Sequence, residues 1–283
     1  MNKVKIICDS TVDMTPELYK KYDVDVVPFH VSFGEEDFLD GQNITLEQLY
    51  EKVKEYGELP RTAAVSSAVF EEKFKEYIDQ GMDIVYIGIG SSLSSAFQSA
   101  FIAKQSFPEG RVALVDSQNL STSSAILTAH AAKLRDEGKS AVEIAEAVQK
   151  LVPNIVGQFS IEEFEYLYKG GRCSGAAKVV GTLLHIHPLL RVIDGKLLVY
   201  KKPRGPMKVA INEQLNSLKE DLPNVDQTIV FITHTGMAPG MVEWVKGEVG
   251  KLVDPKCIEI TTAGAVIGSH CGPGTLGIMY LKK

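Results

Sequence analysis

The sequence of 283 residues has few cysteines, and no two of them have the spacing of a redox or zinc motif. Cys8, Cys173, Cys257 and Cys271 are far apart along the chain. This distribution indicates neither a disulfide framework nor a zinc knuckle. We therefore expect reduced thiols, as in the cytoplasm.

Long apolar runs and a secretion signal are also missing. Lys178, His185, His187 and Arg191 interrupt the most apolar stretch, so no window reaches the eighteen or so residues of a membrane span. The chain starts directly in a strand-like segment, without the basic and apolar regions of a signal peptide. These features predict a soluble, cytoplasmic protein.

The chain as a whole has no excess of positive charge, because its formal net charge is -6. This value argues against a nucleic-acid-binding protein. Residues 169–208 nevertheless contain nine Lys or Arg and one acidic residue, which gives this segment a charge of +8. The segment is either a docking face for an anionic partner or a set of solvated lysines and arginines.

What the first half does contain is an alternation of apolar strand-like runs and helical windows, typical of a parallel sheet covered by helices. The predicted strands are Val4–Asp9, Val24–Phe29, Asp83–Gly88 and Arg111–Asp116, and the predicted helices lie near 45–56, 69–80, 95–106 and 121–137. Thr15 followed by Pro16, and Ser140, are typical helix starts.

The second half is less regular and predicts a second α/β domain, with the boundary between residues 1–158 and 159–283. Its predicted helices end at Gly170–Gly171 or lie near 175–184, 206–219 and 239–250. Asp194–Gly195 indicates a hairpin between strands near 186–193 and 196–200. A strand from Thr228 to Thr233 and two closing strands complete the prediction.

The segment Gly88–Ser95 combines glycines and serines between a predicted strand and a predicted helix. Backbone N–H groups and hydroxyls at a helix N-terminus favour an anion, so the loop is a candidate anion site. The alternative is that one serine caps the helix and the others are solvated.

Other patterns indicate no cofactor, no metal and no hydrolase. Leu93 stands where a dinucleotide motif needs its third glycine. The nearest resemblance to a nucleophile elbow has His270 at its centre. His185 and His187 would supply half of a metal site, but no third ligand is evident, so a surface strand is the better interpretation.

His270 lies in a turn-like segment, residues 264–274, that is dense in glycine and includes Pro273. Glycine permits close approach of the backbone. Such a histidine is well suited to donate a hydrogen bond to a buried anion, with a charge that can be tuned near neutrality.

Several separated motifs make the chain resemble, over essentially its whole length, the DegV family of bacterial fatty-acid-binding proteins. They are Asp9-Ser10-Thr11-Val12-Asp13, Ser91–Ala100, Asp116-Ser117, Leu167–Ser174, His187-Pro188-Leu189-Leu190 and Gly268–Gly274. The sequence departs from the family pattern after Thr62, where Ala63-Ala64-Val65 follows, and after Ser94, where Ser95-Ala96 follows.

The resemblance implies a carrier, not an enzyme, that holds one long-chain fatty acid such as palmitate in an apolar tunnel between the two domains. It implies that Thr62, Ser94 (or Ser95, if the register slips by one) and His270 bind the carboxylate. It also implies that a separate fatty acid kinase converts this carboxylate to an acyl phosphate. Arg172 and Arg204, with Lys201 and Lys202, are expected to face that kinase, and peripheral membrane contact is expected during lipid exchange.

Two other hypotheses remain open at this point. One is an enzyme of lipid or small-acid metabolism in which His270 acts as a general base beside Ser94. The other is an interaction protein that uses the +8 segment on nucleic acid, which the acidic net charge disfavours.

Overall fold

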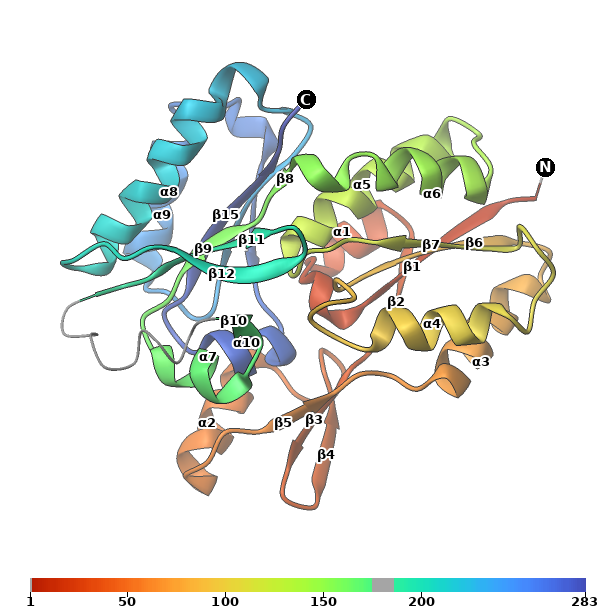
Figure 1. Ribbon diagram of the computed structural model, residues 1–283, viewed down its shortest axis with the longest axis horizontal. Helices are drawn as coiled ribbons and strands as arrows, with labels where there is room; N and C mark the ends of the chain where they lie inside the picture. The colour runs from red at the N-terminus through yellow and green to blue at the C-terminus, as the bar shows by residue number, and fades with distance from the viewer. Residues whose placement is uncertain (1, 175–185) are drawn as a thin grey trace.

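A computed structural model describes residues 2–174 and 186–283 of the chain. Its strands form three sheets, of four, three and eight strands, which lie side by side with helices around them (Figure 1). The four-stranded sheet is on the right of this view, the eight-stranded sheet is on the left, and the three-stranded sheet lies at the bottom. The mixed α/β class predicted from the sequence is confirmed.

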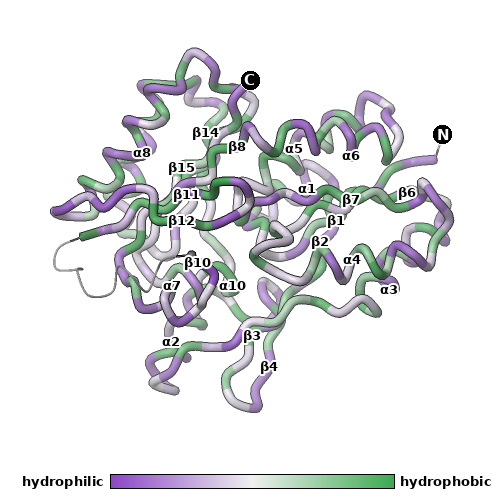
Figure 2. The backbone as a smooth tube through the Cα atoms, in the orientation of Figure 1, coloured by the Kyte–Doolittle hydropathy of each residue, from purple (hydrophilic) through white to green (hydrophobic). Residues whose placement is uncertain are grey.

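The four-stranded sheet is parallel and has the order β2-β1-β6-β7. Its strands are β1 (Val4–Asp9), β2 (Val24–Val27), β6 (Asp83–Gly88) and β7 (Val112–Asp116). Successive side chains of β6 enter two different cores: Ile84 and Tyr86 pack with α3 (Ser67–Ile78) and α4 (Ala96–Lys104). Val85 and Ile87 pack with α5 (Thr122–Asp136) and α6 (Ala141–Gln149). The sheet is therefore covered on both faces, which explains why its strands are almost continuously apolar (Figure 2).

Two predicted helix starts are confirmed by the capping groups. The Thr15 hydroxyl accepts a hydrogen bond from the Leu18 N–H at the start of α1 (Pro16–Lys21). Ser140 and Glu143 form a reciprocal capping box at the start of α6. These caps use local side chains only, so the sequence was sufficient to identify them.

The predicted strand Val24–Phe29 is too long, because β2 ends at Val27, before Pro28. The chain then enters a small antiparallel sheet that the sequence reading did not include. It consists of β3 (His30–Phe33), β4 (Glu36–Leu39) and β5 (Arg61–Ala63), with α2 (Leu46–Tyr56) between β4 and β5. These strands are three or four residues long, too short for a clear alternation pattern.

The eight-stranded sheet is built from the second half of the chain, with β8 paired to β15 beside the order β10-β12-β11-β9-β15-β13-β14. Its strands are β8 (Ile155–Val156), β9 (Gln158–Ser160), β10 (Cys173–Ser174), β11 (Leu189–Ile193), β12 (Lys196–Lys201), β13 (Val230–His234), β14 (Ile258–Thr262) and β15 (Leu276–Leu281). The predicted hairpin is present: Asp194 and Gly195 have φ values of 49° and 73°, as a two-residue hairpin turn requires.

The helices of the second half are α7 (Phe164–Gly170), α8 (Met207–Asp221), α9 (Pro239–Val249) and α10 (Ala265–Cys271). The predicted turn around His270 is wrong, because this segment folds as α10. Gly268 sits where α10 meets α2, and a Cβ there would lie 2.2 Å from Leu46 Cδ1. The glycine that suggested a turn thus permits the close approach of α10 and α2. The predicted helix near 175–184 lies outside the described residues.

Within residues 2–174 and 186–283, no helix is long and apolar enough to cross a membrane. All four cysteines lie in the described residues, where they are buried and form no disulfide with one another. The domain boundary near residue 158 remains a prediction.

Candidate functional site

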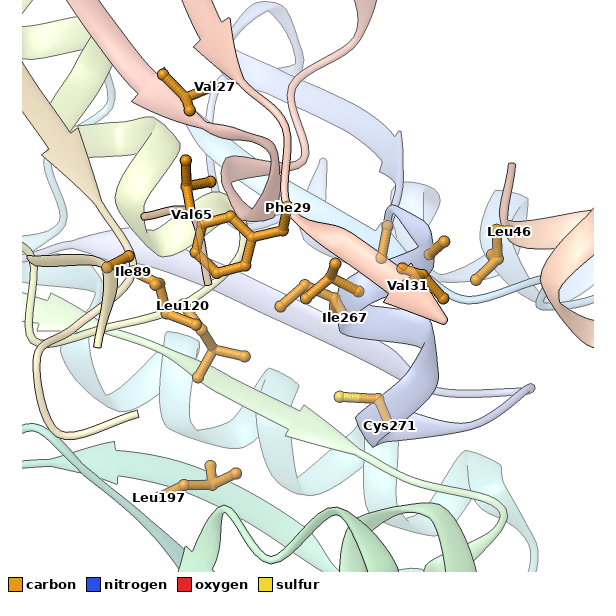
Figure 3. Packing of buried hydrophobic residues seen from close by; sticks show 14 of the residues in the cluster. Val27, Phe29, Val31, Leu46, Val65, Ile89, Leu120, Leu197, Ile267 and Cys271 are labelled. Atoms are coloured by element: carbon orange, nitrogen blue, oxygen red, sulfur yellow. The ribbon is translucent and has the colours of Figure 1, made fainter. Parts of the chain in front are cut away.

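A cavity lies where β5, the loop of residues 89–94, α7, α10 and β12 approach one another. Figure 3 shows several of its apolar residues, which come from distant segments and surround a common space. The lining residues are Phe29, Thr62, Ala63, Ala64, Ile89, Leu93, Ser94, Leu120, Leu167, Arg172, Leu197, Val266, Ile267, His270 and Cys271. The wall is mostly hydrocarbon, with a small number of polar groups.

Thr62 and His270 form a polar pair in this wall. Thr62 lies on β5, opposite Val31 of β3, and His270 lies in the last turn of α10. Thr62 Oγ1 and His270 Nε2 are 2.8 Å apart, which is hydrogen-bonding distance. Residues separated by 208 positions in the sequence thus meet at one point of the cavity.

The His270 imidazole is held in an environment that disfavours its charged form. Burial, and then the positive charge of Arg172, lower the pKa of His270 to about 4. Nδ1 is buried and has no hydrogen-bond partner in the described part of the chain. A Cβ on Gly170 would be 2.4 Å from this nitrogen, so α7 covers that edge of the ring. At neutral pH, His270 is therefore a neutral imidazole that presents Nε2 to the cavity. The sequence-based expectation of a charge tuned near neutrality was wrong.

The structure separates Ser94 from Ser95. Ser94 lines the cavity, and its Oγ accepts a hydrogen bond from the Ala96 N–H at 3.3 Å. Ser95 is exposed, is the residue before α4, and makes no side-chain capping bond. Of these two candidates, only Ser94 shares the cavity with Thr62 and His270.

The other polar groups of the Gly88–Ser95 loop do not converge on the cavity, as the anion-site interpretation would require. Ser91 Oγ donates a hydrogen bond to Asp116 Oδ2 at 2.6 Å, and Ser92 bonds to the Gly195 carbonyl. A Cβ on Gly90 would be 2.8 Å from the Gln118 Cα, so this glycine permits close backbone contact. The loop is fixed to its neighbours, and Ser94 is the serine that it contributes to the cavity wall.

The four basic residues expected to face a partner differ in their surroundings. Arg172 is exposed but also lines the cavity, and its Nη1 donates to the Gly170 carbonyl at 2.7 Å. Lys202 and Arg204 are exposed. Lys201 is ion-paired with Glu213 at 2.7 Å. The pairing leaves Lys201 less available to a partner than Lys202 and Arg204.

Sequence reasoning did not identify the apolar walls. Phe29, Ile89 and Leu120 each lie shortly after a strand of the parallel sheet, which is the one signal that could have located them. Leu167 and Leu197 come from the other half and have no such signal. In the described residues, His187 lies 3.5 Å from Glu162, and no group of three or more His, Cys, Asp or Glu side chains is placed to hold a metal. His185 lies outside the described residues.

Comparison with known proteins shows similarity over the full chain. The family model described as "Uncharacterised protein, DegV family" matches residues 3–283. A DegV domain-containing protein of Clostridium perfringens is 33% identical over 292 residues, with 100% of both chains covered. A protein of Thermotoga maritima named "Fatty acid-binding protein" is 30% identical over 282 residues, covering 97% of this chain and 96% of the relative.

A solved structure from Thermus thermophilus, described as fatty acid binding of a DegV family protein, superposes with a TM-score of 0.91. Its sequence is 29% identical, and the match covers 99% of this chain and 100% of that one.

Proposed function

Because this chain belongs to the DegV family, we propose that it binds one long-chain fatty acid in the cavity between β5, the loop of residues 89–94, α7, α10 and β12. The related proteins from Thermotoga maritima and Thermus thermophilus are described as fatty acid binding. The observation that carries the proposal is the Thr62–His270 pair in a mostly apolar wall. This arrangement suits an amphiphile with a single polar end.

The acyl chain supplies the binding free energy. Burial of roughly fifteen methylenes at about 0.8 kcal/mol each contributes about 12 kcal/mol. Association costs about 4 kcal/mol or more in lost translational and rotational freedom. Tight binding is therefore expected without any covalent step.

The polar residues compensate the carboxylate, which would otherwise be an unpaired buried charge. In our proposal the carboxylate takes the place of the Thr62–His270 hydrogen bond and accepts from Thr62 Oγ1, His270 Nε2 and Ser94 Oγ. Arg172 adds positive charge at the same cavity. A neutral His270 suits this role, because it donates one hydrogen bond and needs no proton from solution.

Mass spectrometry of an organic extract tests the proposal. Protein purified without added lipid should release a long-chain fatty acid in a ratio near one per chain. Delipidated protein should take up palmitate or oleate to the same ratio. An empty extract together with no uptake would refute fatty acid binding.

We further propose that the chain is a carrier and presents the carboxylate to a separate kinase. Arg172 supports this, since it is exposed and yet lines the cavity. Loaded protein should give acyl phosphate with a fatty acid kinase and ATP, and should give none alone. Acyl phosphate formed by this chain and ATP without the kinase would contradict the carrier role.

The alternative of an enzyme with His270 as general base has weaker support. A pKa of about 4 makes His270 a poor base near neutral pH, and no described residue orients its Nδ1. Its Nε2 contacts Thr62 and not Ser94. Turnover of acyl esters or thioesters by the isolated chain would favour the enzyme.

A further inference from the structure

The motif Asp9-Ser10-Thr11-Val12-Asp13 is buried directly after β1, yet none of its residues lines the fatty acid cavity. Asp9 is 0% exposed and Asp13 is 4% exposed. Burial of two carboxyl groups lowers the stability of the fold unless hydrogen bonds compensate them. Their partners show what the motif does.

Asp9 is bonded to the segment that leads to Ser94. Its Oδ2 accepts from the Ile89 N–H at 3.0 Å and from the Tyr86 hydroxyl at 2.8 Å. Ile89 lines the cavity. A Cβ on Gly88 would be 2.2 Å from Asp9 Oδ2, so the glycine gives the carboxylate room to reach this loop.

Ser10 is bonded to the opposite wall. Its Oγ accepts from the Phe29 N–H at 3.1 Å, and Phe29 is one of the cavity residues. This bond fixes the backbone at the point where the chain passes from the parallel sheet to the three-stranded sheet that carries Thr62.

Asp13 is bonded to the start of the helix that carries His270. Its backbone is left-handed, with φ of 57°, and its Oδ1 accepts from the Gly264 N–H at 2.7 Å. Its Oδ2 accepts from the Ser121 hydroxyl, next to the cavity residue Leu120. Asp40 supports the same helix, because its Oδ1 accepts from the Ala265 N–H at 2.7 Å.

We infer that Asp9, Ser10 and Asp13 are positioning residues, which hold three walls of the cavity from behind so that Ser94 and His270 take one fixed geometry around the carboxylate. Each of the three polar side chains bonds to a different wall segment. Asp13 has the most direct effect, because it holds the beginning of α10 and His270 lies near the end of this short helix. The inference rests on the proposed function for its binding readout only.

The test compares Asp13→Gly with Asp13→Asn and with Asp23→Gly. Glycine removes the carboxylate without straining the left-handed backbone. Asparagine keeps an acceptor for the Gly264 N–H. Asp23→Gly is the matched control, because Asp23 also has a left-handed backbone, with φ of 47°, and is paired with Lys5 away from the cavity.

Two quantities are measured on delipidated protein at a temperature at which every variant is folded: the dissociation constant of a fluorescent fatty acid and the NMR titration of the His270 ring. Asp13→Gly should weaken binding by about tenfold or more. It should also move the pKa of His270 from about 4 toward 6.5, because a displaced ring is less buried. Asp13→Asn and Asp23→Gly should resemble the wild type in both.

Equal effects of Asp13→Gly and Asp23→Gly on both quantities would overturn the inference. If the wild type binds no fatty acid, the proposed function fails, but the His270 titration still decides the positioning role. If Asp13→Gly does not fold, Gly264→Ala replaces it. A Cβ at Gly264 would be 2.9 and 3.0 Å from the two carboxylate oxygens of Asp40 and 3.3 Å from Asp13 Oδ1, so it would disturb both carboxylates that hold the start of α10. This variant should show the same two changes, and a wild-type result would refute the inference.

Discussion

At the scale of single residues, the cavity contains few polar side chains, and each has a different neighbourhood. Thr62 and His270 are bonded to each other, whereas Ser94 bonds to the backbone at the start of α4. In the proposed function, the hydrophobic wall provides affinity for the acyl chain, and the polar residues decide the orientation and head group of the ligand.

Substitution of the polar residues should separate Ser94 from Ser95. Thr62→Val, Ser94→Ala and His270→Ala should each weaken fatty acid binding by about 10- to 100-fold, because each removes a hydrogen bond to a buried charge. Ser95→Ala should change the dissociation constant by less than about twofold, since Ser95 is exposed. Titration of delipidated protein with a fluorescent fatty acid measures all four. An equal loss for Ser94→Ala and Ser95→Ala would show that the register of this loop has been misassigned.

The burial of Asp40 leads us to expect an unusual dependence of protein stability on pH. Burial, opposed in part by hydrogen bonds, raises the pKa of Asp40 to about 6, above its value in the unfolded chain. The folded protein therefore binds more protons than the unfolded chain between about pH 4 and 6. The contribution of this group to stability falls as the pH rises through that window.

Asp40→Asn should remove this contribution and keep an acceptor for the Ala265 N–H. At pH 7 the variant should be more stable than the wild type, by up to about 3 kcal/mol for a shift of about two pKa units. The difference should shrink toward pH 4. Urea unfolding at several pH values measures this difference. The lowered pKa of His270 gives the opposite dependence of stability on pH, but it is the same in both proteins and cancels in the comparison. A difference that does not vary with pH would contradict the assignment.

At the scale of elements, contacts with several neighbouring segments place α10. Asp13 and Asp40 bind its first turn, α2 packs on Gly268, and the end of α7 covers His270. A seven-residue helix is not stable alone, so these contacts hold it. The orientation of His270 therefore depends on residues from both halves of the chain.

The close contact between α7 and α10 makes Gly170 sensitive to substitution, and Gly247 of α9 is the matched control. Gly170→Ala should weaken fatty acid binding by about tenfold or more, because the new Cβ would displace the His270 ring. Gly247→Ala, in the middle of α9, meets nothing within 4 Å. It should raise the free energy of unfolding by about 0.5–1 kcal/mol and leave binding unchanged. Binding and thermal unfolding of both variants measure this. Normal binding by Gly170→Ala would contradict the close contact.

At the scale of the whole molecule, the cavity is enclosed by both halves of the chain. Residues such as Phe29 and Ser94 come from the part that forms the four-stranded and three-stranded sheets. Leu197 and His270 come from the part that forms the eight-stranded sheet. A ligand in this cavity contacts both parts, and its binding should stabilise their association.

The positive segment makes a prediction about the partner. The double variant Lys202→Glu, Arg204→Glu should bind fatty acid normally, because neither residue lines the cavity. It should lose most acyl phosphate formation with a fatty acid kinase at low salt, where reversed charges repel most strongly. The double variant Lys251→Glu, Lys256→Glu, which changes the same charge elsewhere, should keep this reaction. If both double variants support acyl phosphate formation equally well, the kinase does not dock on the +8 segment.

The sequence by itself determined the elements whose signals are local. The parallel strands β1 and β6, the caps at Thr15 and Ser140, and the Asp194–Gly195 hairpin were all predicted. Apolar periodicity, capping hydroxyls and turn residues act within a few positions, so they can be read without knowledge of the fold. Membership of the family followed from motifs that are spread along the chain.

Only the tertiary structure decided which side chains meet. The pairing of Thr62 with His270, the choice of Ser94 over Ser95 at the cavity wall, and the helix at Ala265–Cys271 all depend on contacts between segments far apart in the sequence. Glycines that suggest a turn can instead permit two helices to pack closely, as Gly268 does. Local propensity favours a turn there, and packing against α2 together with the bonds to Asp13 and Asp40 outweighs it.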